Sequence, residues 1–424
     1  LAGGKGERLM PLTRYRAKPA VYFAAKYRII DFALSNLVNS GVFALYVLVQ
    51  FKSQSLNEHI ERGWQFGGAL RGRDFFVTLV PAQMWRGEHW FQGTADAVFQ
   101  NMHLINMFRA DRVCIFAADH IYKMDVSQML RWHLDQQADI TLAANVVPVN
   151  EASQFGCIKT DGSGRILEFM EKPTVPPEIP DKPGFCYVSM GNYIFERKVL
   201  VDALVEDSMQ STTHDFGRDI LPKLVHQRAR VFAYDFSTNV LPGPKTRPRY
   251  SYEWRDDKPY WRDVGTLKAY WQAHMELLNP DSEMTLYNPQ WPVRTVSFAD
   301  PPSYSYPADG YNCTVNRVML AEGSRILGSS VTDETGSVIE KSIIGHDVII
   351  GRNCRIKRAI IDAHNNIPDN TVIGEDPEAD ARNYYVDPKS GLVVLGIPRI
   401  YYQKGTTADT ENTTQDDDTD PLGL

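Results

Sequence analysis

The sequence has few cysteines, no long apolar run and no excess of basic residues. Its five cysteines are scattered without a CxxC pair, which excludes a disulfide framework and a cysteine zinc site. A reducing, cytoplasmic setting is the simplest that fits. The longest clean apolar run, Val42 to Val49, is far shorter than the ~18 residues of a membrane helix. No signal peptide is visible, so we expect no membrane association.

The charge balance also lacks the basic excess of a nucleic-acid binder. The formal net charge of the 424 residues is −7. Residues 401–424 carry much of it, with one lysine and six acidic residues, so the remainder is nearly neutral. This last segment is polar and rich in Thr and Asp, and we expect it to be disordered.

Residues 1–275 alternate short apolar runs with longer amphipathic stretches. The runs 43–49, 113–117 and 140–146 predict buried strands, and 95–109 and 125–137 predict helices. This alternation is typical of an α/β, Rossmann-like domain with a mostly parallel sheet and helices on both faces.

The character changes after residue 275. Residues 276–310 are rich in Pro and Tyr and predict an ordered linker. Residues 311–400 follow a six-residue rhythm, with aliphatic side chains at Val338, Ile344, Ile350 and Ile356 and, in a second register, at Ile361, Ile367 and Ile373. We expect a left-handed parallel β-helix rather than an irregular all-β sandwich, because a sandwich does not hold a six-residue phase.

The first nine residues contain a glycine loop with the pattern GGxGxR. Gly3 and Gly4 would let backbone amides approach phosphates closely. The loop is neither a Walker A motif nor the dinucleotide fingerprint. Lys5, Arg8 and Lys18 lie nearby in the sequence. Their charges would offset the repulsion between phosphate groups, which is ~4 kcal/mol per pair of unit charges in a cleft. The alternative is that they form a solvated basic face. Such loops normally follow a strand, so we expect a short segment to precede the first residue.

Longer motifs follow the loop in a fixed order. Residues 17–21 read AKPAV, 27–36 YRIIDFALSN, 93–97 GTADA, 119–122 DHIY, 169–173 FMEKP, 189–191 SMG, 214–217 HDFG and 260–266 YWRDVGT. Together they resemble the sugar-nucleotide pyrophosphorylases, most closely their bacterial ADP-glucose pyrophosphorylase branch, across residues 1–400. The resemblance implies Mg²⁺-dependent adenylyl transfer from ATP to glucose 1-phosphate. It also implies a homotetramer that feeds glycogen synthesis and responds to small anionic metabolites.

The resemblance assigns roles residue by residue. The catalytic candidates are Lys5, Arg8, Lys18, Asp119 and Asp263. Asp119 follows an apolar run, where ligands bind in parallel sheets, and it would share Mg²⁺ with Asp263. The glucose 1-phosphate candidates are Phe91, Gly156, Glu171, Lys172, Ser189, Asp215 and Trp261. The nucleotide candidates are Gly3, Gly4, Gln50, Trp90, Gly93 and Thr94. The alternative role for each aspartate is a helix cap or a surface ion pair. The alternative for Trp90 and Trp261 is burial in the core.

The basic cluster that binds effectors in enteric members is only partly matched. Arg16 and Arg28 match it, whereas Tyr15 and Tyr22 replace a lysine and a histidine. We expect an allosteric anion site that uses Arg16, Tyr22 and Arg28, without fixed selectivity for fructose 1,6-bisphosphate. The alternative is that Arg28 pairs with Asp31 one helical turn later.

Two further residues depart from the family pattern. Lys5 replaces a common arginine, which keeps the charge but loses the bidentate fork, and Phe91 replaces a common tyrosine.

Three other functions remain open. The chain could be a non-catalytic regulatory subunit, although all of the charged candidates are present. It could use another base than adenine. Its β-helix could transfer acyl groups through His346 or His364, which we expect instead to be surface residues in turns. An oligomerising β-helix is the favoured interpretation.

Overall fold

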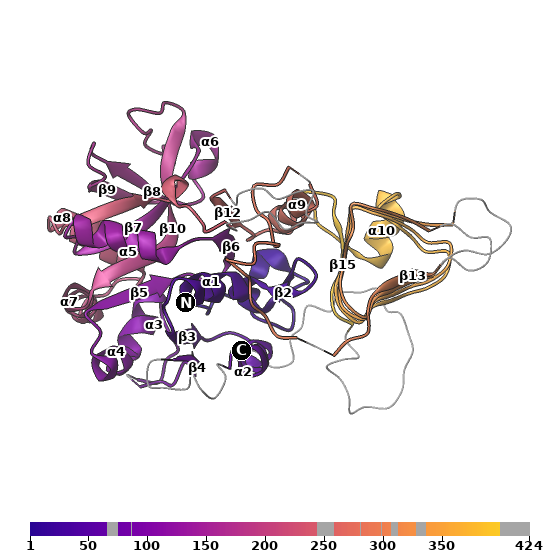
Figure 1. Cartoon of the computed structure of the whole chain (residues 1–424), viewed down its shortest axis with the longest axis horizontal. Coiled ribbons are helices and arrows are strands. Elements are labelled where there is room, and N and C mark those ends of the chain that lie inside the picture. Colours follow the sequence, from indigo (N-terminus) through magenta and orange to yellow (C-terminus); the bar gives the residue numbers. More distant parts are fainter. Residues whose placement is uncertain are drawn as a thin grey trace.

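The computed structural model describes residues 1–65, 75–85, 87–243, 258–279, 281–297, 299–306, 313–327 and 336–398. An α/β body and a β-helix lie beside each other along the long axis of the molecule (Figure 1). The predicted disordered tail, 401–424, lies outside the described residues. No helix in the described part of the chain is long and apolar enough to cross a membrane.

The main sheet of the body has six strands, in the order β11-β7-β10-β8-β9, with β5 also paired to β10. They are β5 (Arg112–Phe116), β7 (Ile140–Pro148), β8 (Gly156–Thr160), β9 (Ile166–Glu171), β10 (Phe185–Glu196) and β11 (Val231–Asp235). The pair β11 and β7 is parallel, whereas β10 runs antiparallel to β5, β7 and β8. The predicted fold class is confirmed, with the qualification that this long antiparallel strand makes the sheet mixed.

A second parallel pair joins β3 (Ala44–Val49) to β4 (Phe76–Pro81). The first two residues of the chain lie between β3 and β5. The Ala2 N–H donates to the Leu48 carbonyl at 2.8 Å, and the Ala118 N–H donates to the Leu1 carbonyl at 3.1 Å. The glycine loop therefore leaves the body at the carboxyl ends of β3 and β5, the position expected for a ligand-binding loop.

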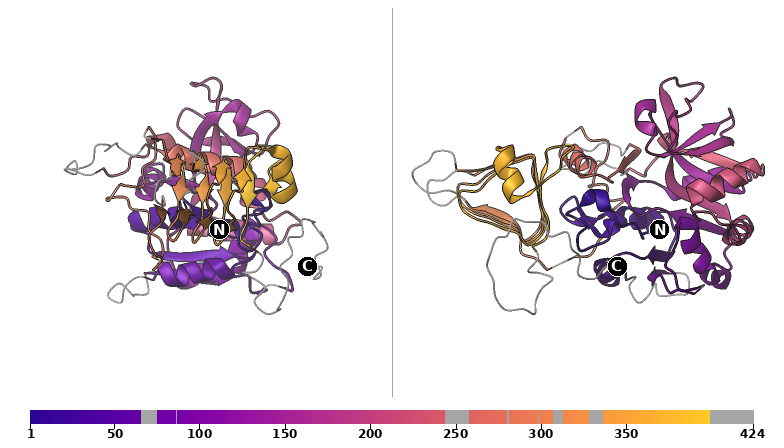
Figure 2. Two further views of the ribbon diagram at one scale, coloured as in Figure 1. Left: turned by 90° about the vertical axis from the view of Figure 1, so that its right-hand side faces the viewer. Right: turned by 180° about the vertical axis from the view of Figure 1, so that it is seen from behind.

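The helices of the body cover the sheets on both sides (Figure 2). They are α1 (Ile29–Asn39), α2 (Gln54–Gly63), α3 (Thr94–Gln100), α4 (Met102–Phe108), α5 (Val126–Asp135), α6 (Val149–Ala152), α7 (Arg197–Ser208), α8 (Leu221–His226) and α9 (Leu267–Leu277). The single helix predicted over 95–109 is wrong. It breaks at Asn101, which leaves the helical range at ψ 16° and donates its side-chain amide to the Ala97 carbonyl at 2.8 Å.

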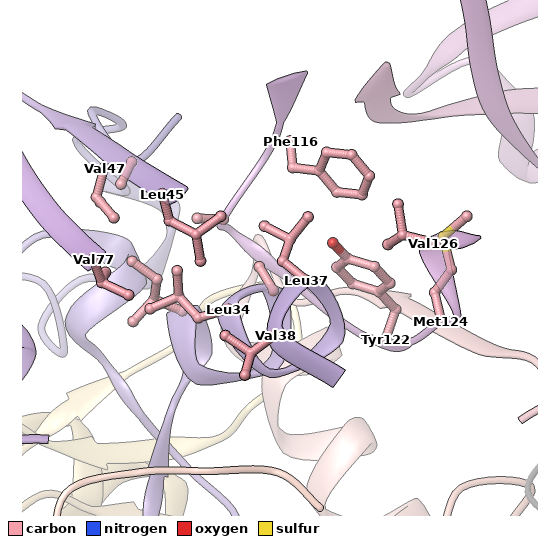
Figure 3. Close-up of a cluster of buried hydrophobic side chains, with 14 of the residues drawn as sticks. Leu34, Leu37, Val38, Leu45, Val47, Val77, Phe116, Tyr122, Met124 and Val126 are labelled. Atoms are coloured by element: carbon pink, nitrogen blue, oxygen red, sulfur yellow. The ribbon is translucent and has the colours of Figure 1, made fainter. Parts of the chain in front are cut away.

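Helix α1 is buried almost throughout and anchors the site side of the body. Its residues Leu34, Leu37 and Val38 pack between the β3–β4 pair and the segment that follows β6 (His120–Lys123), as Figure 3 shows. The Asn36 side chain donates to the Tyr122 carbonyl at 3.0 Å and accepts the Met124 N–H at 3.0 Å. Helix α1 therefore fixes the strand that begins directly after Asp119.

Strand β6 pairs antiparallel with β12 (Tyr260–Asp263), which sets Asp263 opposite His120. This two-stranded ribbon brings together two acidic positions that lie far apart in the sequence. It is the structural basis of the candidate site described below.

Three sheets of short strands form the β-helix, and their stacking is visible in Figure 2. The strands are β13 (Tyr304–Tyr306), β14 (Cys313–Asn316), β15 (Met319–Leu320), β16 (Arg325–Leu327), β17 (Ser337–Glu340), β18 (Ile343–Ile344), β19 (Ile349–Ile350), β20 (Arg355–Lys357), β21 (Ala359–Ile361), β22 (Asn366–Ile367), β23 (Val372–Ile373), β24 (Tyr385–Val386) and β25 (Val393–Leu395). All of their pairings are parallel except that of β24 with β25. Helix α10 (Pro377–Asn383) precedes β24, and β13 lies inside the segment predicted as linker.

The six-residue rhythm marks the inward side chains with one exception. The predicted isoleucines from Ile344 to Ile373 are buried, whereas Val338 is half-buried and its neighbour Ile339 takes the inward position. Ile339 lies beside Ile356 and Ile356 beside Ile373, so each of these turns advances 17 residues. Three repeats of six residues would make a turn of 18, one residue more than these turns contain. The inward positions therefore shift by one residue, and the sequence shows two registers.

Candidate active site

A cleft of about 850 Å³ opens where the glycine loop, the β6–β12 ribbon and the ends of β8 to β10 meet. Sixteen predicted site residues line it: Gly3, Gly4, Arg8, Lys18, Gln50, Phe91, Gly93, Thr94, Asp119, Gly156, Glu171, Lys172, Ser189, Asp215, Trp261 and Asp263. Two predicted residues do not. The Lys5 side chain is 67% exposed and lies 4.0 Å from Glu7. Trp90 is 54% exposed, which contradicts burial, the alternative considered for it.

Lys18 joins the two candidate metal ligands. Its Nζ lies 3.1 Å from Asp119 Oδ2 and 3.4 Å from Asp263 Oδ1, and its side chain is only 7% exposed. Burial acts to lower the pKa of Lys18, but the two carboxylates outweigh it and hold that pKa above its ordinary value. Burial likewise acts to raise the pKa of Asp119, yet Lys18 and His120 hold it well below the usual range. The ammonium and this carboxylate are therefore both charged at neutral pH.

Two glycines bring the charged groups close together. Gly6 has a φ of +69°, and a Cβ there would lie 2.9 Å from the Lys18 Cβ. A Cβ on Gly265 would lie 2.9 Å from Asp263 Oδ2 and 3.0 Å from Arg8 Nη2. Only glycine fits either position without displacement. The Arg8 guanidinium and the Asp263 carboxylate therefore both border Gly265 in the cleft.

His120 is a cleft residue that sequence reasoning missed. Its Nδ1 lies 3.4 Å from Asp119 Oδ1, and its ring centroid lies 5.8 Å from that of Trp261. The only sequence signal was its place directly after Asp119 in the DHIY motif. Because β12 pairs with β6, His120 also lies opposite Asp263, a relation that no local pattern reveals.

On the other side of the cleft, the Glu171 carboxylate lies between two glycines. A Cβ on Gly156 or on Gly217 would approach Glu171 Oε2 to 3.0 Å. Lys172 Nζ lies 3.2 Å from Glu171 Oε1, and the Lys172 N–H donates to the Phe155 carbonyl at 3.0 Å. Gly217 was not singled out from the sequence, although it ends the quoted HDFG motif. This side therefore pairs a cation with a carboxylate at the cleft surface.

A lock joins the start of α3 to the short helical turn Phe216–Ile220. Thr94 Oγ1 donates to Asp215 Oδ2 at 2.9 Å and accepts the Phe216 N–H at 3.0 Å. Asp215 Oδ1 accepts the N–H groups of Gly217 and Arg218, which caps the turn. The Asp215 side chain is therefore held by its neighbours and does not swing freely in the cleft.

The cleft offers oxygen ligands of the kind that a metal ion needs. Among the described residues, no group of three or more His, Cys, Asp or Glu side chains gathers as a cage. The carboxylates of Asp119, directly before β6, and of Asp263, at the end of β12, both contact the Lys18 ammonium. One or two carboxylates, completed by substrate phosphates and waters, is the arrangement that Mg²⁺ prefers, so the residues fit that ion.

The predicted effector residues lie outside this cleft and close to one another. The Arg16 and Arg28 guanidinium carbons lie 5.3 and 4.9 Å from the centroid of the Tyr22 ring. The alternative of an Arg28–Asp31 pair takes another form, because the Arg28 backbone N–H, not its guanidinium, donates to Asp31 Oδ2 at 2.8 Å. Asp31 Oδ1 is occupied by His59 and Trp64.

One of the two histidines considered for acyl transfer does not have the surface position expected for it. His346 is buried, with its ring 4.6 Å from that of Tyr22, so the surface position predicted for it is wrong. His364 is partly exposed and lies 3.5 Å from Asp347. The sequence placed His346 in a turn but could not show that the body packs against that turn.

Comparisons with known proteins match both parts of the chain. Residues 1–280 match the family model described as nucleotidyl transferase, and residues 310–395 match the one described as GlmU-like, C-terminal hexapeptide. A protein of Photobacterium profundum named glucose-1-phosphate adenylyltransferase is 45% identical over 405 residues, covering 93% of this chain and 96% of its own length. Proteins of the same name from Thermodesulfovibrio yellowstonii and Deinococcus radiodurans are 46% and 45% identical, over 93% and 95% of this chain and 94% and 97% of their own lengths.

Proposed function

Because this chain belongs to the nucleotidyl transferase family and, within it, to the glucose-1-phosphate adenylyltransferases, we propose that it makes ADP-glucose and pyrophosphate from ATP and glucose 1-phosphate. The product would serve glycogen synthesis. The observation that carries the proposal is the convergence of Lys18, Asp119 and Asp263 in a cleft entered by a glycine loop.

The reaction needs positioning and charge neutralisation more than covalent chemistry. A phosphate oxygen of glucose 1-phosphate attacks the α-phosphorus of ATP, a new P–O bond forms, and the bond to the leaving pyrophosphate breaks. No protein nucleophile is required. Two polyanions must approach each other, so the cationic groups of Arg8 and Lys18 would offset their repulsion.

Asp119 and Asp263 would hold Mg²⁺, which supplies positive charge beside the reacting phosphates when it is bound. Lys18 keeps these two carboxylates at one point of the cleft. Its ammonium has three N–H donors, so one can donate to a phosphate oxygen while the other two face the aspartates. The Gly3 and Gly4 amides would face the triphosphate, with Lys5 at the rim of the cleft.

The remaining cleft residues would bind the sugar and the nucleotide. Lys172 would hold the phosphate of glucose 1-phosphate, and Glu171 and Asp215 would accept hydrogen bonds from sugar hydroxyl groups. Further sugar contacts would come from Phe91, Gly156, Ser189 and Trp261, and nucleotide contacts from Gln50, Gly93, Thr94 and, from the rim, Trp90. Gln50 Oε1 accepts the Phe91 N–H at 2.6 Å, which holds the segment before α3 to the end of β3.

Regulation and assembly complete the proposal. Arg16, Tyr22 and Arg28 would bind small anionic metabolites, because two guanidinium groups share one aromatic ring there. The flat sheets of the β-helix would join the subunits of a homotetramer. All five cysteines are free thiols, which suits the cytoplasm.

The experiment compares the purified chain with two variants in ATP, glucose 1-phosphate and Mg²⁺, and identifies ADP-glucose by chromatography. Asp263→Asn should lower kcat by about 10²–10³-fold, because a charged group beside the reacting phosphates is lost. Asp202→Asn is the matched control, since that carboxylate lies exposed on α7. A folded wild-type chain that forms no ADP-glucose would favour the regulatory subunit instead.

A further inference from the structure

A strained residue stands directly before Asp215, one of the residues proposed to bind the sugar. His214 has a φ of +54°, in the left-handed region that few residues other than glycine adopt. Such a conformation persists only where the surrounding contacts hold it, and it is typical of residues beside functional sites. His214 does not line the cleft, whereas Asp215 does. The contacts of His214 therefore determine the backbone from which Asp215 enters the cleft.

A buried carboxylate holds the His214 ring. Asp207 lies in the last turn of α7, and its side chain is only 6% exposed. The His214 ring lies 2.7 Å from it, measured from Nδ1 to Asp207 Oδ2, and because a carboxylate accepts hydrogen bonds the ring nitrogen is the donor. Thr212 completes the network. Its hydroxyl donates to Asp207 Oδ1 at 2.8 Å and accepts the His214 N–H at 3.2 Å.

The His214 carbonyl joins this network to the helix on the nucleotide side of the cleft. It accepts the N–H groups of Ala95 and Asp96 at 2.8 and 3.3 Å, which lie in the first turn of α3 and have no partner within that helix. Helix α3 begins at Thr94, whose hydroxyl donates to Asp215. Helices α3 and α7 also lie side by side (Figure 1). His214 therefore connects α7, the start of α3 and the backbone of Asp215.

The place of Asp215 matters because a second carboxylate lies close to it. A Cβ on Gly217 would lie 3.0 Å from Glu171 Oε2 and 3.3 Å from Asp215 Oδ1, so both side chains border this glycine. The two carboxylates would accept hydroxyl groups of one sugar. A misplacement of about 1 Å at such a site can lower a rate on the order of 100-fold. Asp215 therefore needs support from outside the cleft.

We propose that Asp207 and His214 form a positioning pair for the sugar side of the cleft. The inference rests on the proposed function and adds to it two residues that contact no substrate. Asp207 fixes the His214 ring, and the ring keeps the backbone in its left-handed conformation. That backbone sets Asp215 beside Glu171. Loss of the pair weakens the binding of glucose 1-phosphate and leaves the reacting side of the cleft in place.

The test compares substitutions of His214 by KM for glucose 1-phosphate and by kcat for ADP-glucose formation. His214→Ala removes the ring and disfavours the left-handed backbone, so KM should rise roughly tenfold or more while kcat changes less than about threefold. His214→Asn tolerates a positive φ and keeps a side-chain N–H donor for Asp207, so its KM should stay within about threefold of wild type. His214→Gly tolerates the backbone but lacks the donor, so its KM should rise as in His214→Ala.

The partner residue gives the reciprocal test. Asp207→Ala should reproduce the KM of His214→Ala, and the double variant should exceed either by less than about twofold, because the two side chains act as one unit. Asp202→Ala, an exposed position on the same helix, is the matched control and should resemble wild type. Multiplying effects in the double variant would overturn the pair. So would a wild-type KM in His214→Gly, or a His214→Asn as impaired as His214→Ala.

Hydrogen exchange separates this inference from the proposed function, because it needs no turnover. The Ala95 amide should exchange at least about tenfold faster in His214→Ala, since its acceptor moves, while His214→Asn should keep the wild-type rate. Equal exchange in all three proteins would overturn the proposal. If His214→Ala does not fold, His214→Gly and Asp207→Ala carry the same comparison.

The two readouts together assign a failure. If the wild-type chain forms no ADP-glucose while exchange at Ala95 changes as expected, the proposed function fails and the positioning pair stands. If ADP-glucose forms and KM for glucose 1-phosphate is unchanged in His214→Ala and Asp207→Ala, this inference fails alone.

Discussion

At the scale of single residues, the molecule depends on placing like charges together without repulsion. Asp119 and Asp263 lie near each other because β6 pairs with β12, and the Lys18 ammonium, which contacts both carboxylates, offsets their repulsion. Two unit charges 4 Å apart interact by about 4 kcal/mol at an effective dielectric near 20. The attraction of Lys18 to each carboxylate therefore offsets a repulsion between the carboxylates of similar size. The same lysine is therefore both a structural and a chemical element, and separate variants are needed to examine substrate binding.

Lys172 gives such a separation, because it lies on the sugar side and contacts neither aspartate in the described structure. Lys172→Gln should raise KM for glucose 1-phosphate by about 10–100-fold, since a charge-assisted hydrogen bond of about 1.5–3 kcal/mol is lost. KM for ATP should change much less. Steady-state kinetics with each substrate varied in turn measures both, and Lys198→Gln, an exposed lysine on α7, is the control. Equal increases in both KM values would contradict the assigned side.

Sequence alone predicted the charged residues of the cleft because each stands in a motif whose residue types match the chemistry. It missed His120 and Gly217, whose importance comes from the pairing of β6 with β12 and from the room that Glu171 needs. Lys5 and Trp90, also predicted for the site, do not line the cleft, because neighbours in sequence can point in opposite directions from one loop. The direction of a loop side chain depends on contacts that no pattern carries.

At the scale of elements, the lock between α3 and the Phe216 turn depends on one glycine. A Cβ on Gly93 would lie 2.2 Å from the His214 carbonyl oxygen and 2.4 Å from that of Thr213. Gly93→Ala should therefore separate these segments and lower the free energy of unfolding by about 2–3 kcal/mol, with a loss of activity. Urea unfolding measures it. Gly162→Ala, where nothing lies within 4 Å of the added Cβ, should be neutral; equal losses would refute the lock.

Helix α9 carries a buried histidine that makes stability depend on pH. His274 Nε2 accepts the Ala24 N–H at 3.0 Å, so the ring must be neutral, and burial lowers the pKa of His274 to about 4. Its stabilising contribution is present above the ordinary pKa of 6.5 and is lost as the pH falls from there toward 4.

The comparison that isolates this group is His274→Gln, whose side-chain oxygen can still accept the Ala24 N–H. Between pH 7 and pH 4.5 the wild-type chain should lose about 2–3 kcal/mol more unfolding free energy than the variant, at about 1.4 kcal/mol per unit of pKa shift. Urea titrations at the two pH values measure the difference. Parallel losses in the two proteins would show that this ring does not titrate with folding.

Elements were easier to predict than their direction and their breaks. The apolar runs 43–49, 113–117 and 140–146 match β3, β5 and β7 within one or two residues. An apolar run fixes a buried strand but not which way it runs, so the antiparallel course of β10 was not foreseen. The break at Asn101 comes from a side-chain hydrogen bond to Ala97 that competes with the helix, a local effect that apolar periodicity does not record.

At the scale of the whole molecule, the two parts were predictable because each has its own period in the sequence. Their contact was not. Arg16 and Asp362 are separated by 346 positions and meet only because the β-helix packs beside the glycine loop. Trp271 Nε1 also donates across this contact, to the Lys341 carbonyl at 2.8 Å. Pairs of this kind join the β-helix to the body.

The most direct test of the account is nucleotide selectivity. The purified chain is incubated with glucose 1-phosphate, Mg²⁺ and, in separate reactions, ATP, UTP, dTTP or GTP, and pyrophosphate release is followed. The account predicts release with ATP far above the other three, with ADP-glucose as the second product. Release mainly with another nucleotide, from a folded chain, would contradict the assignment to adenylyl transfer.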